Sequence, residues 1–283
     1  MAAVSKAVLI TGCSSGIGRA SALRLAEAGW TVYASARRRD AIADLEQAGA
    51  RTLELDVTNE ASMRAAVQAV EQAEGAVGVL VNNAGYSQSG AIETVPLDAV
   101  RRQFETNVFG AVRLIQLVLP GMRRQRSGRI VNVGSMGGRL TFPGGGYYHA
   151  TKYALEAISD ALRFEVAGFG IGVTLLEPGL ITTDFGEAAS AAVQSIGTGE
   201  DGPYAGFNAA VATLTREAYE SPMRRLGGGP DSVARVIEKV IGAGRPPTRV
   251  TVTPSAKLMI GTRRLLSDRA WDAAMRRQFP QPR

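Results

Sequence analysis

The chain has 283 residues, 45% of them hydrophobic and 20% charged, which is enough to bury the core of one large α/β domain. The formal net charge is +6, but the basic residues are scattered and lack interleaved aromatics, so we expect no nucleic-acid partner. The single cysteine excludes an intramolecular disulfide, and we see neither a signal peptide nor an apolar run of the roughly 20 residues that span a bilayer, so we expect a cytoplasmic protein.

The first predicted element is a short apolar strand, residues 7–11, followed by a glycine-rich turn and a helix that ends at Gly29. Glycines between a strand and a helix N-terminus let backbone amides approach a pyrophosphate, which the helix dipole also favours. The pattern therefore favours a dinucleotide-binding turn over an ordinary tight turn. The turn residues expected to bind are Gly12, Ser14, Ser15, Gly16, Ile17 and Gly18.

The second predicted strand, residues 31–36, ends where an NAD-binding site would carry an acid for the ribose hydroxyls. Ala36 occupies that place, and three arginines follow it. Guanidinium groups favour a ribose 2′-phosphate instead. We therefore predict NADP(H) as the cofactor, bound by Arg37 and Arg38. The alternative is a solvated loop before a helix that begins near Asp40.

The third and fourth predicted strands, residues 51–56 and 77–81, each run into a short motif. Asp56-Val57 ends the third strand, and Asp56 is also suited to cap the helix that follows. The fourth strand runs into Asn82-Asn83-Ala84-Gly85. Both motifs would lie at the carboxyl edge of a parallel sheet, where ligands bind.

A long helix is predicted over residues 97–119, and we expect it to stop before Pro120, which cannot donate the next helical hydrogen bond. Asn107 lies in its interior, where asparagine is usually unfavourable or faces solvent. The position is therefore unusual for a purely structural residue.

The catalytic prediction depends on Tyr148 and Lys152, which are four residues apart and so share one face of a predicted helix. A lysine ammonium near a phenol favours the phenolate, and such a tyrosine can exchange a proton with an alcohol or ketone near neutral pH. An isolated pair at this spacing also occurs for packing and solubility. Here a buried strand, residues 129–135, ends in Ser135 just upstream, so Ser135 and Tyr148 are expected to face one site.

The sixth predicted strand, residues 172–177, ends in a Pro-Gly turn that reaches Thr183. A helix over residues 231–241 and a last strand over 249–253 complete the pattern. Because strands alternate with helices throughout, we predict a single-domain, doubly wound parallel sheet, Rossmann-like, with helices on both faces, over residues 1–283.

Ser135, Tyr148 and Lys152, together with the Thr-Gly-x-x-x-Gly-x-Gly spacing from Thr11 to Gly18, resemble the short-chain dehydrogenase/reductase family. The stretch from Gly110 to Phe185 is most similar to the members that act on steroids and retinoids. The resemblance implies that Ser135 orients the substrate oxygen, that Tyr148 transfers the proton, and that Lys152 tunes Tyr148 and grips the nicotinamide ribose.

The resemblance also implies roles outside these three residues. It implies that a local kink at Asn107 holds a water that relays protons to the lysine, which makes Asn107 a fourth catalytic residue. It implies an adenine-binding corner at Asp56, a motif beside the cofactor at Asn83, and a nicotinamide-binding turn after Glu177. The cofactor-binding residues that it adds are Asp56, Val57, Asn83, Ala84, Gly85, Tyr148, Lys152, Pro178, Gly179, Ile181 and Thr183.

We therefore predict an enzyme that uses NADP(H) to interconvert a ketone and a secondary alcohol on a mid-sized apolar substrate of steroid, retinoid or polyketide type. One alternative is a 3-oxoacyl thioester reductase with the same catalytic residues, and another is a non-catalytic NADP(H)-sensing protein on the same fold. No histidine, cysteine and acid cluster has metal-ligand spacing, so we expect no metal. We expect a homodimer or homotetramer without membrane contact.

Residues 186–229 show weak periodicity and contain glycines at 186, 197, 199, 202 and 206, so we predict a mobile lid with short helices over the substrate. The alternative is a static loop above a core of aromatics. A basic helical extension, residues 255–283, is expected to pack on its own domain or on a sister subunit, and contact with a membrane surface is the alternative. Lone His149 is predicted at a packing or rim position. The predicted substrate-pocket walls are Leu140, Phe142, Phe185, Tyr204 and Phe207.

Overall fold

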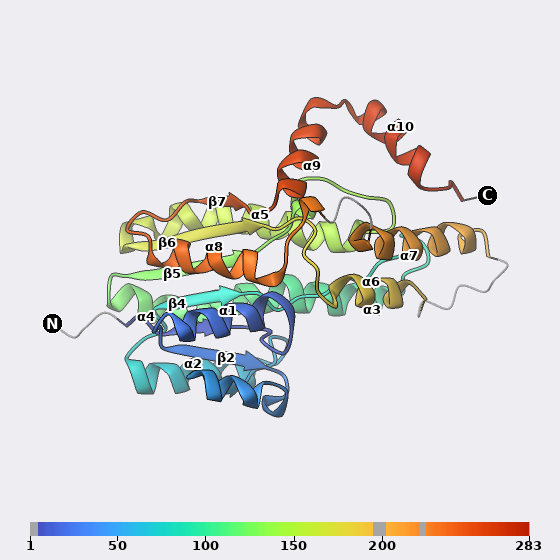
Figure 1. The fold of residues 1–283 in the computed structure, drawn as a ribbon. Coiled ribbons are helices and arrows are strands. Elements are labelled where there is room, and N and C mark those ends of the chain that lie inside the picture. Colours follow the sequence, from blue (N-terminus) through green and yellow to red (C-terminus); the bar gives the residue numbers. More distant parts are fainter. Residues whose placement is uncertain (1–4, 195–201, 221–224, 283) are drawn as a thin grey trace.

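The computed structural model describes residues 5–194, 202–220 and 225–282. Within these ranges the strands form one parallel sheet in the order β3-β2-β1-β4-β5-β6-β7 (Figure 1). The strands are β1 (Val8–Ile10), β2 (Val32–Ala36), β3 (Arg51–Glu54), β4 (Val79–Asn82), β5 (Gly128–Val133), β6 (Ile171–Glu177) and β7 (Arg249–Thr251). The strand order reverses direction at β1, so the ligand crevice of this topology lies beyond the carboxyl ends of β1 and β4.

Helices cover both faces of the sheet, because alternate residues of each strand point to opposite sides. Val8 and Ile10 of β1 pack in one core cluster with α1 (Gly16–Glu27) and α8 (Pro230–Gly242), while Leu9 packs in a second cluster on the other face. The helices of the second face are α2 (Glu60–Glu74), α4 (Gly110–Arg124) and α5 (Gly146–Val166). The predicted fold class, a doubly wound Rossmann-like α/β sheet, is therefore confirmed.

The long helix predicted over residues 97–119 differs from the structure in two ways. It is divided into α3 (Leu97–Phe104), a π-helical turn (Glu105–Phe109) and α4. It also does not stop before Pro120, which lies inside α4. The helix tolerates this proline because the carbonyl that loses its partner belongs to Gln116, which is exposed to solvent. Burial of Met122 against the sheet holds the following turn in place.

Two further boundaries differ from the prediction. The helix expected near Asp40 is a 3₁₀ helix, Arg39–Ala48. The last strand ends at Thr251 rather than at Thr253, because the Thr253 side chain accepts a hydrogen bond from Ala256 N and caps the next helix.

Part of the C-terminal third of the chain lies beyond the carboxyl ends of the strands, toward which the arrowheads point in Figure 1, while α8 and β7 belong to the sheet and its helical layer. Helices α6 (Phe185–Gln194) and α7 (Ala205–Glu220) form a pair, and α9 (Pro254–Leu265) leads to α10 (Asp268–Gln278). The predicted lid glycines at 197 and 199 fall outside the described residues. Among the residues that are described, no helix is both long and apolar enough to cross a membrane.

Candidate active site

Ser135, Tyr148 and Lys152 come from β5 and α5 and lie at the carboxyl edge of the sheet. Ser135 follows β5 directly, and its Oγ accepts a hydrogen bond from Gly137 N at 3.0 Å. Tyr148 and Lys152 occupy the first two turns of α5, where Lys152 Nζ lies 5.7 Å from the centroid of the Tyr148 ring. Lys152 Nζ also donates to Val133 O at 2.8 Å. The Lys152 side chain therefore reaches from α5 to the end of β5 and fixes its ammonium beside the Tyr148 ring.

Burial sets the electrostatics of Lys152. Its side chain is nearly inaccessible, with a relative exposure of 6%, and burial lowers the pKa of its ammonium to about 8. At neutral pH the lysine still carries its charge. A cation fixed beside a phenol ring favours the phenolate, which is the chemistry expected from the Tyr148–Lys152 spacing.

His149 is a structural residue of the loop between Ser135 and α5. Its Nδ1 lies 3.0 Å from Gly137 O, and its Nε2 accepts a hydrogen bond from Phe142 N at 3.3 Å. Burial lowers its pKa to about 4, so the ring is neutral and donates from Nδ1. Both ring nitrogens are used to hold the loop, which agrees with the predicted packing position.

Asn107 lies in the π-helical turn and is 2% exposed. Its Oδ1 accepts from Tyr86 N at 3.1 Å, and its Nδ2 donates to Tyr86 O at 2.9 Å and to Thr151 Oγ1 at 3.1 Å. Thr151 Oγ1 in turn donates to Tyr148 O at 2.7 Å. The side chain thus ties the loop after β4 to the turn of α5 that carries Tyr148 and Lys152. The contact with Thr151 has no signal in the sequence.

The glycine-rich turn after β1 has the shape of a phosphate cradle. Gly12 and Gly16 have φ values of +73° and +55°, which favour glycine. A Cβ on Gly18 would lie 2.3 Å from Gly12 O and 2.5 Å from Asn83 Nδ2. Only glycine therefore allows the N-terminus of α1 to lie this close to the end of β1. These residues fit the pyrophosphate of a dinucleotide.

Asn83, which follows β4, and Thr11, which follows β1, support this turn. Asn83 Nδ2 donates to Thr11 O at 2.9 Å and to Gly12 O at 3.2 Å. Thr11 Oγ1 accepts from the backbone amides of Asn83 and Ala84, each at 3.0 Å. A Cβ on Gly85 would lie 3.1 Å from Asn107 Oδ1. The Asn83-Ala84-Gly85 motif therefore connects the glycine turn to the π-helical turn.

The turn after β6 lies against the same glycine turn. A Cβ on Gly16 would meet Thr183 Cγ2 at 3.3 Å. Ile181 forms an isolated parallel bridge with Gly228, in which Thr182 N donates and Leu180 O accepts. The amide and carbonyl of Ile181 itself point to the opposite edge of the chain, because consecutive peptide groups alternate in extended backbone. Pro178 O accepts from Met136 N at 2.8 Å and so joins the turn to the Ser135 loop.

At the other end of the glycine turn, Arg37 and Arg38 are exposed at the rim of a hollow of about 360 Å³. The hollow is lined by Ser14, Ala36, Arg37, Arg38 and Ala41. Arg39 is directed elsewhere, because it donates to Thr52 Oγ1 at 2.8 Å and pairs with Glu46 at 3.0 Å. The two arginines named as cofactor contacts thus lie beside the phosphate cradle.

Asp56 and Val57 follow β3, the edge strand beside β2. Asp56 Oδ1 accepts from Thr58 N at 2.9 Å, and Val57 is buried. The alternative assignment of Asp56 as a helix cap is wrong, because Asn59 caps α2 by accepting from Ser62 N. Asp56 instead stabilises the turn that leads to the cap.

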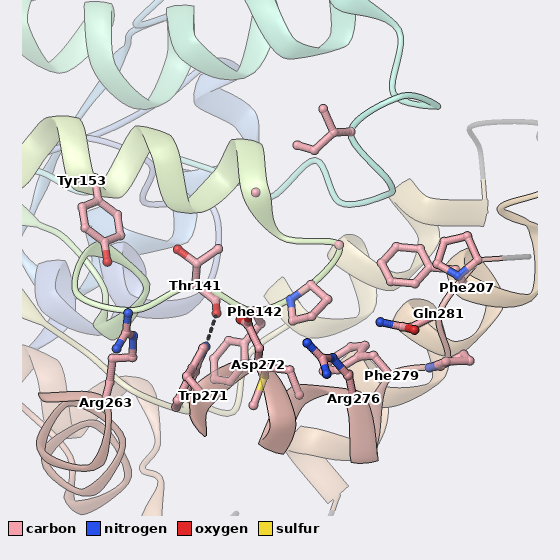
Figure 2. Close-up of a pocket in the computed structure, with 17 residues that line it drawn as sticks. Thr141, Phe142, Tyr153, Phe207, Arg263, Trp271, Asp272, Arg276, Phe279 and Gln281 are labelled. Atoms are coloured by element: carbon pink, nitrogen blue, oxygen red, sulfur yellow. Dashed lines mark hydrogen bonds between the residues drawn. The ribbon is translucent and has the colours of Figure 1, made fainter. Parts of the chain in front are cut away.

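A larger cavity, of about 580 Å³, lies away from the catalytic residues, between the loop around Phe142 and α10 (Figure 2). Trp271, Met275 and Phe279 of the C-terminal region line it together with Phe142 and Phe207. Neither Ser135 nor Tyr148 is among its lining residues, so this cavity is separate from the residues predicted to be catalytic.

Of the five predicted pocket walls, Phe185 contacts Tyr148, with ring centroids 5.4 Å apart. Leu140 is fully buried beneath α9 and is not an accessible wall. Phe142 and Phe207 line the C-terminal cavity, and the Tyr204 hydroxyl donates to Glu93. The prediction was therefore wrong for Leu140, because a helix that follows more than a hundred residues later covers it.

Comparison with known proteins agrees with this geometry. The family model described as short chain dehydrogenase matches residues 6–194. The chain is 36% identical to 3-ketodihydrosphingosine reductase from Bacteroides thetaiotaomicron, over 89% of either chain. It is also 36% identical to retinol dehydrogenase 8 from Bos taurus, over 88% of this chain and 82% of that one.

Solved structures give the same assignment. A short-chain dehydrogenase from Streptomyces avermitilis has a TM-score of 0.78 at 37% identity, over 96% of this chain and 99% of that one. A short-chain dehydrogenase/reductase from Burkholderia phymatum in complex with NAD has a TM-score of 0.77 at 27% identity, over 99% and 98%. Serine dehydrogenase complexed with NADP+ has a TM-score of 0.75 at 25% identity, over 88% and 94%. The chain therefore belongs to the short-chain dehydrogenase family, whose members are oxidoreductases with a fold that binds a nicotinamide cofactor.

Proposed function

We propose that this oxidoreductase uses NADP(H) to interconvert a ketone and a secondary alcohol on a mid-sized apolar substrate. The observation that carries the proposal is the fixed position of Lys152, with Nζ 2.8 Å from Val133 O and 5.7 Å from the centroid of the Tyr148 ring. This arrangement lies at the carboxyl edge of a parallel sheet and beside a glycine cradle, which is where a cofactor and a substrate meet in such folds.

In the proposed reaction, Ser135 and Tyr148 hold one substrate oxygen between their hydroxyl groups. The Ser135 Oγ accepts the Gly137 amide, which leaves its hydroxyl hydrogen available to the substrate. Tyr148 donates a proton to the oxygen during reduction and accepts one during oxidation. Lys152 stabilises the phenolate that remains after proton donation. The nicotinamide, when bound, supplies or accepts the hydride.

The proposed roles extend to the residues around the catalytic group. Asn107 orients α5 at Thr151, and the proton relay implied by the resemblance would run past its π-helical turn. Gly12 to Gly18 hold the pyrophosphate, and the carbonyl and amide of Ile181, with Thr183, hold the nicotinamide carboxamide. Asp56 and Val57 face the adenine.

The proposed preference for NADP(H) depends on Arg37 and Arg38. Both side chains are exposed beside Ser14 at the hollow that follows β2, and the position of the ribose-binding acid holds Ala36. The residues that line the hollow include two guanidinium groups and no carboxylate, which favours a 2′-phosphate over a free ribose hydroxyl, although Arg38 also pairs with Asp40 at 3.9 Å. The solved relatives include one complex with NAD and one with NADP+, so they do not favour either cofactor. The proposed preference therefore rests on Ala36, Arg37 and Arg38 of this chain.

The proposed substrate class follows from the surroundings of Tyr148. Phe185, which begins α6, packs against the Tyr148 ring with the ring centroids 5.4 Å apart, so an apolar side chain borders the site on this side. Two relatives carry names that give retinol and 3-ketodihydrosphingosine, both of which have long apolar parts. We further propose that α6 and α7 act as a lid that excludes water when substrate binds.

We also propose that the protein is a cytoplasmic homodimer or homotetramer. Phe109 on the π-helical turn and Phe164 on α5 are 54% and 87% exposed, which favours a self-association surface on these helices. Sedimentation of the wild type and of a Phe164→Ser variant tests this part, and a monomeric wild type would contradict it.

The enzymatic proposal is tested with ketones of increasing apolar size and constant carbonyl chemistry, each with NADPH and with NADH. We expect kcat/KM to rise with apolar size and to be higher with NADPH. Better turnover of 3-oxoacyl thioesters would favour the reductase of acyl thioesters instead. NADPH binding without turnover of any carbonyl would favour a cofactor-sensing protein.

A further inference from the structure

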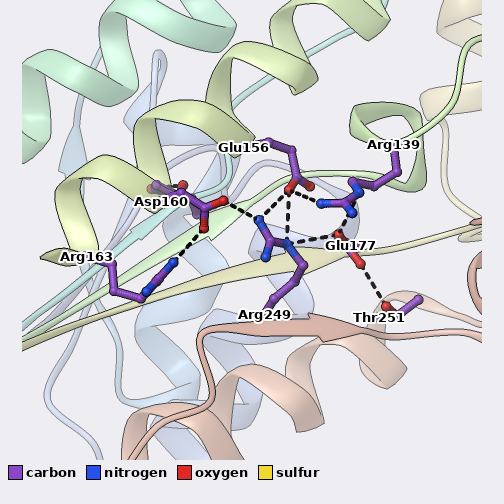
Figure 3. A network of polar contacts seen from close by, with 9 residues as sticks. Arg139, Glu156, Asp160, Arg163, Glu177, Arg249 and Thr251 are labelled. Carbon is purple, nitrogen blue, oxygen red and sulfur yellow. Dashed lines mark hydrogen bonds and ion pairs between the residues drawn. The ribbon is translucent and has the colours of Figure 1, made fainter.

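A cluster of charged side chains lies buried behind the catalytic edge, between α5, β6 and β7 (Figure 3). Glu156 and Glu177 are 7% and 2% exposed. Between them lies the guanidinium of Arg249, and Arg139 approaches from the loop after Ser135. The proposed catalytic cycle uses none of these four residues.

Arg249 is the centre of the cluster. Its Nη2 and Nε donate to Glu156 Oε2 at 2.7 and 3.0 Å, and its Nε lies 3.2 Å from Glu177 Oε1 in an ion pair. Its Nη2 also lies 3.1 Å from the partly exposed Asp160. Glu177 Oε2 accepts from Thr251 Oγ1 at 2.7 Å. One side chain from the edge strand thus joins α5 to β6.

Each of the two glutamates lies next to a part of the proposed active site along the chain. Glu156 follows Lys152 by one turn of α5, and Glu177 is the last residue of β6, immediately before Pro178. Arg139 ends the short 3₁₀ helix that Ser135 caps, and its Nη1 donates to Glu156 Oε2 at 3.3 Å. The cluster therefore adjoins three parts of the proposed site: the turn of α5 that carries Lys152, the turn that begins at Pro178, and the loop that follows Ser135.

The serine loop packs so closely on this part of α5 that it needs a glycine. A Cβ on Gly138 would lie 3.0 Å from Glu156 Cγ and 3.0 Å from Lys152 O. A shift of Glu156 would therefore press on the loop and on the turn of α5 that carries Lys152. Interiors of this density transmit such shifts instead of absorbing them.

Stability alone does not account for the cluster. Replacing a buried ion pair with well-packed apolar side chains is often neutral or stabilising. Glu156 Oε1 lacks a hydrogen-bond partner among the described residues, and Glu177 Oε1 has ion pairs with Arg249 and Arg139 but no hydrogen bond there, so the desolvation of the two carboxylates is only partly offset. The arrangement does have a geometric consequence, because a guanidinium fork accepts only a narrow range of positions for its carboxylates.

We propose that Arg249 is a positioning residue for the reaction proposed above: through Glu156 it fixes the Lys152 turn, and through Glu177 it fixes the Pro178 turn that receives the nicotinamide. The inference rests on the proposed function, but the part of it that concerns cofactor affinity can be measured without turnover. It predicts that loss of the fork weakens the nicotinamide end of the cofactor site and leaves the adenine end intact.

The same geometry predicts a change in the pH profile. The charged groups that face Glu156 are Arg249 from β7, Glu177 from β6, Arg139 from the serine loop and, on its own helix, Asp160. Burial raises the pKa of Glu156, and the Arg249 guanidinium opposes that rise. Without the guanidinium, two carboxylates face each other in the interior, and the pKa of Glu156 rises further. The acid limb of kcat in Arg249→Gln should therefore move to higher pH.

The test compares Arg249→Gln and Arg249→Lys with the control Arg163→Gln, whose ion pair with Asp160 is on the solvent side. We expect NADPH Kd to rise about tenfold in Arg249→Gln, while Kd for adenosine 2′,5′-bisphosphate, which carries only the adenine half, changes less than about twofold. kcat should fall about tenfold with the acid limb displaced. Arg249→Lys should recover part of both losses, and Arg163→Gln should resemble the wild type.

Three results would overturn the inference: unchanged NADPH Kd and kcat in folded Arg249→Gln, equal weakening of both ligands, or an unmoved acid limb. Glu156→Gln, which keeps the shape and removes the charge, replaces Arg249→Gln if that variant does not fold, and the same comparisons then apply. A wild type that binds NADPH but reduces no ketone would refute the proposed function, and the two Kd values would still decide the role of Arg249.

Discussion

Replacing Lys152 with methionine removes a cation from beside the catalytic phenol and leaves a side chain of similar length. At 5.7 Å and an effective dielectric constant of about 20, one unit charge stabilises another by about 3 kcal/mol. That energy corresponds to about 100-fold in rate if it is realised only when Tyr148 becomes a phenolate. We therefore expect kcat of Lys152→Met at pH 7 to fall by about two orders of magnitude.

The same substitution should raise stability. The pKa of buried Lys152 is about 8, below its ordinary value of 10.5, so at neutral pH the folded protein holds a charge that burial disfavours. This cost is fully present below pH 8 and disappears as pH rises to about 10.5, because the unfolded chain then binds more protons than the folded one. It amounts to about 3 kcal/mol at pH 7, of which about 1 kcal/mol is offset by the hydrogen bond to Val133 O.

We therefore expect a net gain of about 2 kcal/mol in the free energy of unfolding at pH 7, and this gain should shrink between pH 8 and 10.5. Denaturant unfolding across this pH range, with kcat measured on the same preparations, checks both effects. Lys239→Met, at an exposed position of α8, is the matched control. A less stable variant would contradict the claim that Lys152 is charged at a cost to stability. Retention of more than about a third of wild-type kcat would contradict the claim that this charge stabilises the Tyr148 phenolate.

Two further predictions concern the cofactor. Arg37→Ala should weaken NADPH binding more than tenfold and NADH binding little, since a charge-assisted phosphate contact contributes about 1.5–3 kcal/mol. Arg39→Ala is the control, because Arg39 is paired with Glu46. Equal affinity of the wild type for both cofactors would contradict the assignment. Gly18→Ala should abolish binding of both cofactors, because its Cβ would lie 2.3 Å from Gly12 O, whereas Gly261→Ala has open space and should leave binding unchanged. Titration by fluorescence measures both, and normal binding by Gly18→Ala would show that the cradle is elsewhere.

Much of the fold could be predicted because the central strands β1, β2 and β4 are fully buried and are therefore largely apolar in sequence. The glycine turn was predictable for a related reason, since its backbone positions admit no other residue. Pro120 was misread because a local rule takes no account of the burial of Met122, which keeps the helix going. Leu140 was misread because α9, which buries it, lies far along the chain.

The candidate site divides in the same way. Tyr148 and Lys152 could be found because one turn of helix places them together whatever the rest of the chain does. The bonds from Asn107 to Tyr86 and Thr151 depend on a π-helical turn that has no periodic signal in the sequence. The pairing of Arg249 with Glu156 joins residues 93 positions apart, and only the assembled sheet brings them into contact.

The central claim, that Tyr148 exchanges the proton with a carbonyl substrate, is tested most directly by NADPH-dependent reduction of a bulky cyclic ketone by the wild type, Tyr148→Phe and Tyr147→Phe. Tyr147 is the internal control, because its hydroxyl donates to Ile92 O and not to the site. We predict that Tyr148→Phe binds NADPH normally and loses about 10²–10⁴-fold in kcat, while Tyr147→Phe remains active. Near-normal turnover by Tyr148→Phe, or inactivity of Tyr147→Phe alone, would contradict the account.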